Sequence, residues 1–391
     1  MAEASLKLGT DWAVKESSLL GYNDENGNYK PIPFDFSRAS IGTRVNRDGL
    51  IETVQDNIPR IDFSDGDGAL KLEPQRTNLF LYSESLESSW TASGTNPPTL
   101  TASQFISPDG TQNASRLQFP STGTISILSQ LFSHTSGQQY TISIYAKSNI
   151  GSNQSFKLFG DYGVPSAISG VFVATNEWQR FEFTYTATAT GSRGGGVYYL
   201  PNTTSDLQIY GIQVEAGSYS TSLIPTSGSA VTRVEDNIDL QNLNTKNIIS
   251  SSSPYTIFFD LSAETELNIV DGNSIFIDLF TNENLTSAKW SLRKYYQDED
   301  GKIRFYSNLD DSTVGYVTST NKKFALSVNG TAVKIYSDGA LQINTTTTSS
   351  HNGFGSIQLR GGSSGRTSTN FSNFYLYTSA LTDIELEELT S

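Results

Sequence analysis

The sequence contains no cysteine, two histidines and one methionine among its 391 residues. Without cysteine, the chain can form neither a disulfide nor a thiolate metal site. With only His134 and His351 available, a zinc site or a Ser-His-Asp triad would have to be built on one of these two side chains. The composition therefore excludes a disulfide-stabilised domain, and we expect no catalytic residue, no metal site and no cofactor.

Positive charge and long apolar runs are also scarce. The chain has 26 Lys and Arg against 40 Asp and Glu, a net charge of −14, and residues 85–231 carry 5 basic and 7 acidic groups. A surface that binds nucleic-acid phosphates is basic, so we expect no nucleic-acid partner. Because no apolar run approaches the length of a membrane-spanning helix, and the N-terminus lacks a signal-peptide pattern, we expect no membrane insertion.

Aromatic residues make up 11% of the chain, and apolar residues alternate with polar ones at a period of two. Tyr140, Ile142, Ile144 and Ala146 illustrate this pattern, which is typical of half-buried β-strands. Turn residues recur about every 8–12 positions, the spacing of a two-sheet sandwich. The sequence therefore predicts an all-β chain with two tandem β-sandwich domains of jelly-roll type, at 85–231 and 232–391, after a small strand-and-turn module at 1–84. We expect a short C-terminal helix, capped by Thr382 with Glu385 three residues on.

The N-terminal module has scattered apolar residues and many charged ones. A module this small buries little apolar surface by itself, so we expect it to pack onto a neighbouring domain or subunit. Residues 1–33 fit either an arm on a neighbouring protein or an edge hairpin of the next domain. Arginine–carboxylate pairs would tie the loops together and contact other chains, and the candidate interface residues are Arg38, Arg44, Arg47, Arg60 and Arg76.

A search for catalytic groups finds little. Glycosidases need two inward carboxylates at a defined separation, but Glu264 and Glu266 lack a third partner and the acids at 298–300 are typical of a solvated turn. Residues 62–68 have a faint calcium-loop pattern, for which a turn is the favoured interpretation. The glycine-rich stretches 191–196 and 360–366 precede no helix, so they predict flexible turns rather than phosphate-binding loops. We expect His134 to lie on the surface and His351 in a polar loop.

Sugar binding is the remaining small-ligand chemistry. It uses exposed aromatic rings that stack on pyranose rings, with polar groups beside them. Trp178 is expected in the core. The candidate carbohydrate-binding residues are Trp90, Tyr162, Tyr198, Tyr199 and Trp290.

Several stretches resemble a known family. RASIGT at 38–43, DGLIE at 48–52, PRIDF at 59–63 and LEPQRTNL at 72–79 resemble a segment repeated in tailed-bacteriophage structural proteins. YTISIYAK at 140–147, NEWQRF at 176–181, IYGIQVEAG at 209–217 and YSTSLIPTSG at 219–228 are similar to its carbohydrate-binding-module-like sandwich. FALSVNGTAVKIYSDG at 324–339 and FYLYTSALTDIELEEL at 374–389 resemble laminin-G-like and concanavalin-A-like lectin domains.

The resemblance implies a non-enzymatic virion protein, a surface-exposed fibre or decoration component of a phage head or tail, which displays lectin-like domains for adhesion to host-surface glycans. Its partners would be other virion proteins and a host-surface glycan, and the chain would be a homo-oligomer, with a trimer favoured. It would be synthesised in the host cytoplasm and released by lysis with the virion. The alternative is a jelly-roll glycoside hydrolase or lyase that degrades polysaccharide.

Overall fold

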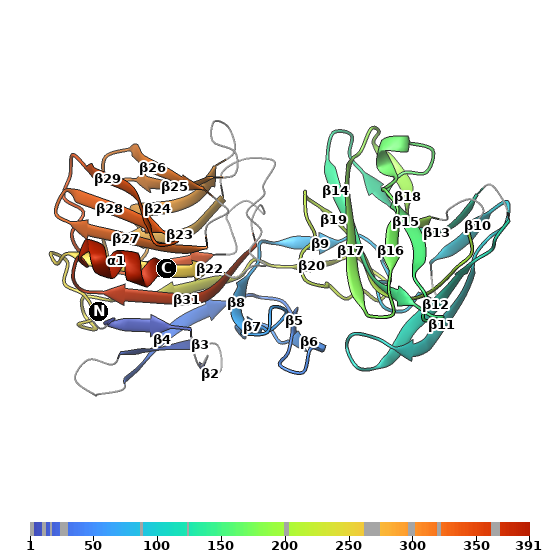
Figure 1. The fold of residues 1–391 in the computed structure, drawn as a ribbon, viewed down its shortest axis with the longest axis horizontal. Helices are drawn as coiled ribbons and strands as arrows, with labels where there is room; N and C mark the ends of the chain where they lie inside the picture. Colours follow the sequence, from blue (N-terminus) through green and yellow to red (C-terminus); the bar gives the residue numbers. More distant parts are fainter. Residues whose placement is uncertain are drawn as a thin grey trace. The chain divides into compact units, whose positions relative to one another are not determined.

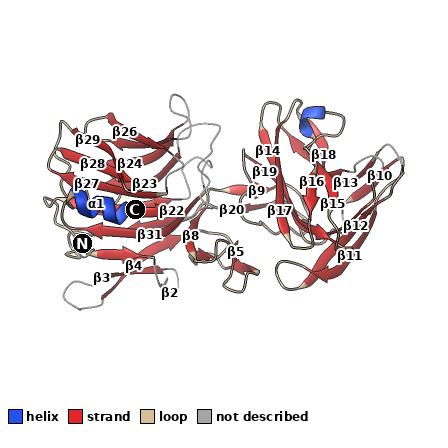
Figure 2. Ribbon diagram, in the orientation of Figure 1, coloured by secondary structure: helices blue, strands red, loops and turns tan. Residues whose placement is uncertain are grey.

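The computed structural model describes residues 4–9, 13–15, 18–23, 30–86, 89–122, 125–198, 203–261, 274–295, 302–318, 322–360 and 368–391. In these ranges nearly every element is a β-strand, as Figure 2 shows. The expected all-β fold class is confirmed. No helix within the described ranges is long and apolar enough to cross a membrane.

The chain divides into two compact units. The central unit is formed by Asp48–Thr53 and Arg76–Arg233, and the terminal unit by Met1–Arg47, Val54–Gln75 and Val234–Ser391. Strand β6 (Ile51–Val54) spans the division between Thr53 and Val54. Each unit has its own hydrophobic core.

The central unit is a sandwich of two antiparallel sheets with five strands each in its described residues. One sheet has the order β10-β13-β18-β15-β16, and the other has the order β11-β12-β19-β14-β17. Leu128 and Val197 of the first sheet and Ile142 and Val214 of the second meet in the core. The elements of the unit are β9 (Arg76–Asn78), β10 (Thr91–Gly94), β11 (Thr99–Ile106), β12 (Gln112–Phe119), β13 (Ser126–His134), β14 (Gln139–Ser148), β15 (Gln154–Phe159), η2 (Pro165–Ala167), β16 (Phe172–Ala174), β17 (Gln179–Thr186), β18 (Gly191–Tyr198), β19 (Ser205–Ala216) and β20 (Val231–Arg233).

The glycine-rich stretch 191–196, expected as a flexible turn, is instead part of β18, in the middle of the first sheet. A Cβ atom on Gly195 would lie 2.9 Å from the Phe132 ring, and one on Gly196, whose φ is +155°, would lie 2.1 Å from the Leu128 carbonyl oxygen. The prediction was wrong because glycine here allows close packing within a strand rather than a reversal of the chain.

The terminal unit is a β-sandwich closed by its own N-terminal strands. A continuous run of hydrogen-bonded neighbours leads from β26 through β25, β24, β23, β30, β21, β4, β3, β1, β31, β22, β27 and β28 to β29. The ends of this run come together, since a Cβ atom on Gly315 of β26 would lie 2.3 Å from the Ile343 side chain of β29. The strands of the unit are β1 (Leu6–Leu8), β2 (Ala13–Lys15), β3 (Ser18–Asn23), β4 (Lys30–Ser37), β5 (Gly42–Val45), β7 (Arg60–Asp62), β8 (Ala69–Leu72), β21 (Asn237–Leu240), β22 (Tyr255–Leu261), β23 (Ser274–Phe280), β24 (Ala288–Tyr295), β25 (Lys302–Ser307), β26 (Ser312–Thr318), β27 (Lys323–Asn329), β28 (Ala332–Ser337), β29 (Ala340–Thr346), β30 (Ser356–Arg360) and β31 (Thr369–Tyr377).

The N-terminal segment is therefore not a separate module at 1–84. Its blue strands belong to the same body as the red strand β31 in Figure 1, and β1 and β8 both pair with β31. Leu6, Phe34 and Leu70 are fully buried in one core together with Phe374. In the described part of 1–33, β3 pairs with both β1 and β4, so this hairpin is an interior part of the terminal unit rather than an edge hairpin of the next domain. The scattered apolar residues find their missing partner surface in the C-terminal part of the same chain.

A buried ionic cluster joins three distant segments of the terminal unit. The Asp236 carboxylate accepts a hydrogen bond of 3.0 Å from Arg38 Nη1, a short one from Arg60 Nη2, and one of 2.8 Å from the Glu73 amide. Arg60 Nη1 also donates to Glu73 at 2.7 Å. All four side chains are buried. Burial opposes the charge on Arg60, but Asp236 and Glu73 outweigh it and raise the pKa of Arg60, so the guanidinium stays charged.

This cluster confirms that arginine–carboxylate pairs tie the N-terminal loops together, but three of the five candidate interface residues are buried, and for Arg44 and Arg47 the interface role stays a prediction. Arg38 and Arg60 are buried within their own unit, and Arg76 is buried with its guanidinium 5.1 Å from the Tyr219 ring centroid. Arg44 is half-buried, and Arg47 is exposed and lies 4.9 Å from the Phe63 ring centroid. Guanidinium groups buried in this way cannot contact another chain.

The C-terminal helix α1 (Asp383–Thr390) begins as expected. The Thr382 hydroxyl accepts from the Glu385 amide, and the Glu385 carboxylate accepts from the Thr382 amide, which completes a capping box. Leu386 is buried against the sheet and Leu389 packs beside it.

Replacing Asp236 with Asn should destabilise the terminal unit by about 3 kcal/mol or more, because Arg38 and Arg60 would remain charged and buried without their shared carboxylate. Urea unfolding followed by fluorescence measures the change. The exposed Glu388→Gln provides the charge-matched control and should leave the midpoint unchanged. Equal midpoints for both variants would contradict a structural role for the cluster.

Candidate functional site

The first sheet of the central unit presents one face to the core and the other outward. Leu158 of β15 lies opposite Val197 of β18, and both are core residues. Since side chains alternate along a strand, their neighbours Lys157, Phe159 and Tyr198 point to the outer face. The register therefore defines this outer face residue by residue.

An aromatic pair occupies the outer face. The rings of Tyr162 and Tyr198 lie 6.2 Å apart at an interplanar angle of 31°. Phe159 contacts both edge-on, with centroid distances of 6.4 Å to Tyr162 and 6.1 Å to Tyr198. Phe159 is fully buried, whereas Tyr162 is 43% exposed and Tyr198 is half-buried. The buried ring thus supports two accessible ones, which fixes their position.

Beside the tyrosines, two sheet positions are glycine and several apolar side chains are exposed. Gly196 lies between Phe159 and Ser129, and Gly194 lies opposite Leu131, so two positions of β18 carry no side chain on this face. Leu131 is 65% exposed, and at the other edge Val171 is 50% and Val173 is 44% exposed. We call the outer-face surface formed by Leu131, Phe159, Tyr162, Val171, Val173, Gly194, Gly196 and Tyr198 the aromatic platform.

The other predicted sugar-binding aromatics do not join the platform. Trp90 is buried and donates from Nε1 to the Tyr82 carbonyl at 2.8 Å, and Trp290 is fully buried in the other unit. Tyr199 lies outside the described residues. Trp178, expected in the core, is half-buried instead, with the Lys147 ammonium 5.1 Å from its ring centroid. Sequence reasoning found Tyr162 and Tyr198 by residue type, but it missed the glycines between them and Leu131.

His134 is buried rather than on the surface. Its Nε2 atom lies 2.9 Å from the Tyr185 hydroxyl, and its ring lies 4.3 Å from Phe132. Burial lowers the pKa of His134, so the imidazole is neutral at pH 7.

His351 forms the geometry of a catalytic dyad in a place that excludes catalysis. Its Nε2 atom lies 2.7 Å from Ser307 Oγ, and Nδ1 lies 2.7 Å from the Ser349 carbonyl, so Nδ1 donates and Nε2 accepts. Ser307 and His351 are both fully buried, which denies a substrate access to the hydroxyl. Burial also lowers the pKa of His351. The pair is a structural hydrogen bond inside the terminal unit.

The terminal unit also aligns two carboxylates that are far apart in sequence. Asp239 of β21 and Asp278 of β23 both lie opposite Gln358 of β30, about 10 Å apart by strand spacing. Burial raises the pKa of Asp239, the direction needed in a general acid. Asp278, however, is 4% exposed, accepts from Ser291 Oγ at 2.5 Å and lies 3.5 Å from Arg360 Nη2. A carboxylate held in this way is structural rather than a free base. Only the sheet register reveals this pair, because its members are 39 residues apart.

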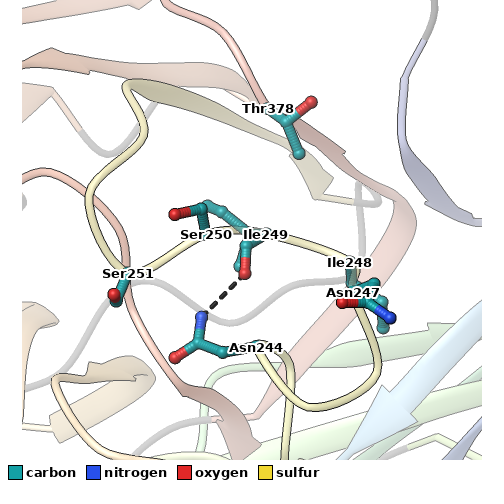
Figure 3. A pocket seen from close by; sticks show the side chains of 7 residues that line it. All are labelled: Asn244, Asn247, Ile248, Ile249, Ser250, Ser251 and Thr378. Carbon is teal, nitrogen blue, oxygen red and sulfur yellow. Dashed lines mark hydrogen bonds between the residues drawn. The ribbon is translucent and has the colours of Figure 1, made fainter.

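A shallow polar pocket of about 460 Å³ lies in the terminal unit between the loop after β21 and the end of β31. In Figure 3, Thr378 faces the loop residues Ile249 and Ser250 across the opening, and Asn244 donates to the Ile249 carbonyl at 2.7 Å. It has no aromatic lining and no ionisable side chain, so it offers no catalytic group. No group of acidic or histidine side chains that could hold a metal occurs in the described ranges. The acids of the calcium-like stretch 62–68 include Asp62, which is ion-paired with Lys71 at 3.0 Å.

No family model and no curated protein matches the chain. Similar solved structures include carbohydrate-binding modules. A CBM4 module is 15% identical, with 33% of this chain and 94% of that chain covered and a TM-score of 0.24. The CBM22-1–CBM22-2 tandem of Paenibacillus barcinonensis Xyn10C is 11% identical, with coverages of 80% and 93% and a TM-score of 0.26.

The similar structures also include an enzyme. Trypanosoma rangeli sialidase in complex with sialic acid is 9% identical, with 95% of this chain and 65% of that chain covered and a TM-score of 0.28. Because all these TM-scores are low, the function proposed below rests on the side chains of this chain.

Ser307→Ala should cost about 1–3 kcal/mol of stability, because the buried Nε2 atom of His351 loses its hydrogen bond. The folded protein should not react with a serine-directed fluorophosphonate. Thermal unfolding and labelling measure the two effects, with the exposed Ser312→Ala as the control. Labelling that disappears only in Ser307→Ala would instead assign Ser307 a nucleophilic role.

Proposed function

We propose that this chain is a non-enzymatic adhesion protein that binds glycans through the aromatic platform of its central unit. The observation that carries this proposal is the pair of the exposed Tyr162 and the half-buried Tyr198, which the buried Phe159 contacts from below. The apolar faces of pyranose rings stack on tyrosine rings, and few other soluble ligands are both flat and rich in hydroxyl groups.

The shape of the platform favours an extended glycan over a small compact ligand. The two glycine positions of β18 let a sugar ring approach the backbone between Leu131 and Phe159. The hydroxyl of Ser129, directly opposite Gly196, is available to hydrogen-bond sugar hydroxyls at this place. A chain of two or more sugar units could thus contact both the tyrosines and the glycine floor.

The absence of hydrolase activity is part of the proposal. It is supported by the burial of the Ser307–His351 pair and by the ion-paired, buried state of Asp278. A jelly-roll hydrolase or lyase is the second candidate, favoured only by the alignment of Asp239 with Asp278 across Gln358.

We further propose that the protein belongs to the virion of a tailed bacteriophage, as a fibre or decoration component synthesised in the host cytoplasm and released by lysis. The support is the resemblance of RASIGT at 38–43 and LEPQRTNL at 72–79 to phage structural proteins. Its partners would be other virion proteins and a host-surface glycan. A homo-oligomer, with a trimer favoured, fits this role because symmetric display converts weak sites into avidity.

Gly194→Leu should abolish glycan retention while the protein stays folded. A Cβ atom at Gly194 meets Ser129 and Leu131 only at ordinary contact distances of 3.6–3.8 Å, so a larger side chain projects over the platform without displacing the sheet. Native gels containing polygalacturonate, xylan or dextran measure retention. Thr186→Leu, an exposed change on the other sheet of the same unit, is the matched control. If no polysaccharide retains the wild-type protein, or if Gly194→Leu is retained equally, the proposed site is wrong.

The purified protein should release no reducing ends from these polysaccharides. Reducing-end release that Asp239→Asn removes, but the exposed Asp311→Asn does not, would favour the hydrolase candidate instead.

A further inference from the structure

The outer face that carries the aromatic platform is nearly free of charge. Among the described outer positions on the five strands, one side chain is charged at neutral pH, the amine of Lys157. No carboxylate occurs among these described positions, although the whole chain has a net charge of −14. By register and alternation, the outer positions on the strands are Thr91, Ser93, Ile127, Ser129, Leu131, Ser133, Ser155, Lys157, Phe159, Val173, Ser192, Gly194, Gly196 and Tyr198.

Lys157 stands in the middle of the platform. It lies directly opposite Tyr198 on the neighbouring strand β18, and Val171 lies at the corresponding position beyond β16. Neighbouring strands are about 4.8 Å apart, so the lysine stem reaches any group bound over the Tyr198 ring. As a whole residue Lys157 is half-buried.

Lys157 also differs from the other cations of the central unit, because among the described residues it takes part in no ion pair, hydrogen bond or ring contact, whereas each of the others has at least one. Arg116 pairs with Asp206 and Arg193 with Asp161. Arg180 donates to the Thr221 carbonyl, and Lys147 lies over Trp178. A cation that has lost part of its hydration without gaining a protein anion is suited to bind an anionic group on a ligand.

We infer that the platform is selective for acidic glycans, and that Lys157 binds the carboxylate of a uronic or sialic acid whose ring stacks on Tyr198. This inference rests on the proposed function and names its ligand class. The absence of acidic side chains from the described outer positions of the five strands reduces the repulsion that the net charge of the chain would otherwise impose on such a ligand. In a carboxylated sugar the charged group is attached directly to the ring, so the carboxylate lies beside the apolar face. Tyr198 and Lys157 lie on adjacent strands, so one can stack on that face while the other binds the carboxylate.

The test compares polygalacturonate with its carboxyl-reduced form, a neutral polymer that keeps the same backbone linkages. Binding to immobilised polymer is measured for the wild type and for Lys157→Gln, Lys157→Arg, Lys147→Gln and Tyr198→Ala. Lys157→Gln should weaken binding to the acidic polymer about fivefold and leave binding to the neutral polymer unchanged, the size expected for one partly exposed ion pair. Lys157→Arg should keep the preference, since it retains the charge. Lys147→Gln removes the other lysine of the unit, which lies on the second sheet, and should have no effect.

The results separate the two proposals. Two results together would overturn the acidic preference but support the platform as the binding site. In the first, Tyr198→Ala loses binding to both polymers. In the second, Lys157→Gln binds the acidic polymer as well as the wild type does. Unchanged binding in Tyr198→Ala would overturn the platform itself. Sialic-acid polymer and dextran sulfate complete the set. If dextran sulfate binds as well as the carboxylated polymers and with the same dependence on Lys157, the site recognises anions in general, and the carboxylate assignment is wrong. A wild-type protein that binds neutral polymers only would overturn the inference as well.

Discussion

The terminal unit depends on the carboxylate of Asp236. Arg38, Arg60 and the Glu73 amide all donate to it, so one side chain links the C-terminal part of the chain to segments that lie 163 to 198 residues earlier. The cost of burying these charges is offset because both terminal nitrogens of Arg60 and one of Arg38 meet a carboxylate oxygen. Arg38 further donates to the backbone carbonyls of Ser40, Ile58 and Gln55, which makes the loops part of the same cluster. Such a cluster leaves little freedom for the strands on either side.

Because the Asp236 cluster fixes the segments around it, the short N-terminal strands can form part of the terminal sandwich. Strands as short as β1, with three residues, gain little from their own hydrogen bonds. They become stable because β31 supplies a ready edge and the core covers Leu6 and Leu8. Most of the central unit, Arg76–Arg233, is inserted in the sequence between Gln75 and Val234, and the unit has its own hydrophobic core. A surface on the central unit can therefore change without disturbing the strands that close the other sandwich.

The aromatic platform is assembled from residues that look unremarkable in sequence. Glycine at 194 and 196 leaves bare backbone in the centre of a sheet, and Phe159 is buried beneath the two tyrosines. Removing side chains here creates the flatness that sugar rings require, and the missing acids leave Lys157 as the single charge on the outer strand positions. If β18 carried side chains at positions 194 and 196, those side chains would cover the backbone at the centre of this face.

The sequence by itself determined the strand content, the central sandwich and the capped helix, because period-two alternation and the Thr382–Glu385 spacing are local properties. It also pointed to arginine–carboxylate pairs in the first 84 residues, though not to Asp236 as their centre. Only the tertiary structure decided where the N-terminal strands pack, since apolar residues at 6, 34 and 70 specify burial but not the surface that buries them. The same limit applies to the candidate sugar-binding residues. Residue type alone does not separate Trp90 and Trp290 from aromatic residues on the surface, and the fold buries both. Tyr162, Tyr198 and Lys157 become one surface only through the register of β15 with β18, which depends on contacts between residues about 40 positions apart.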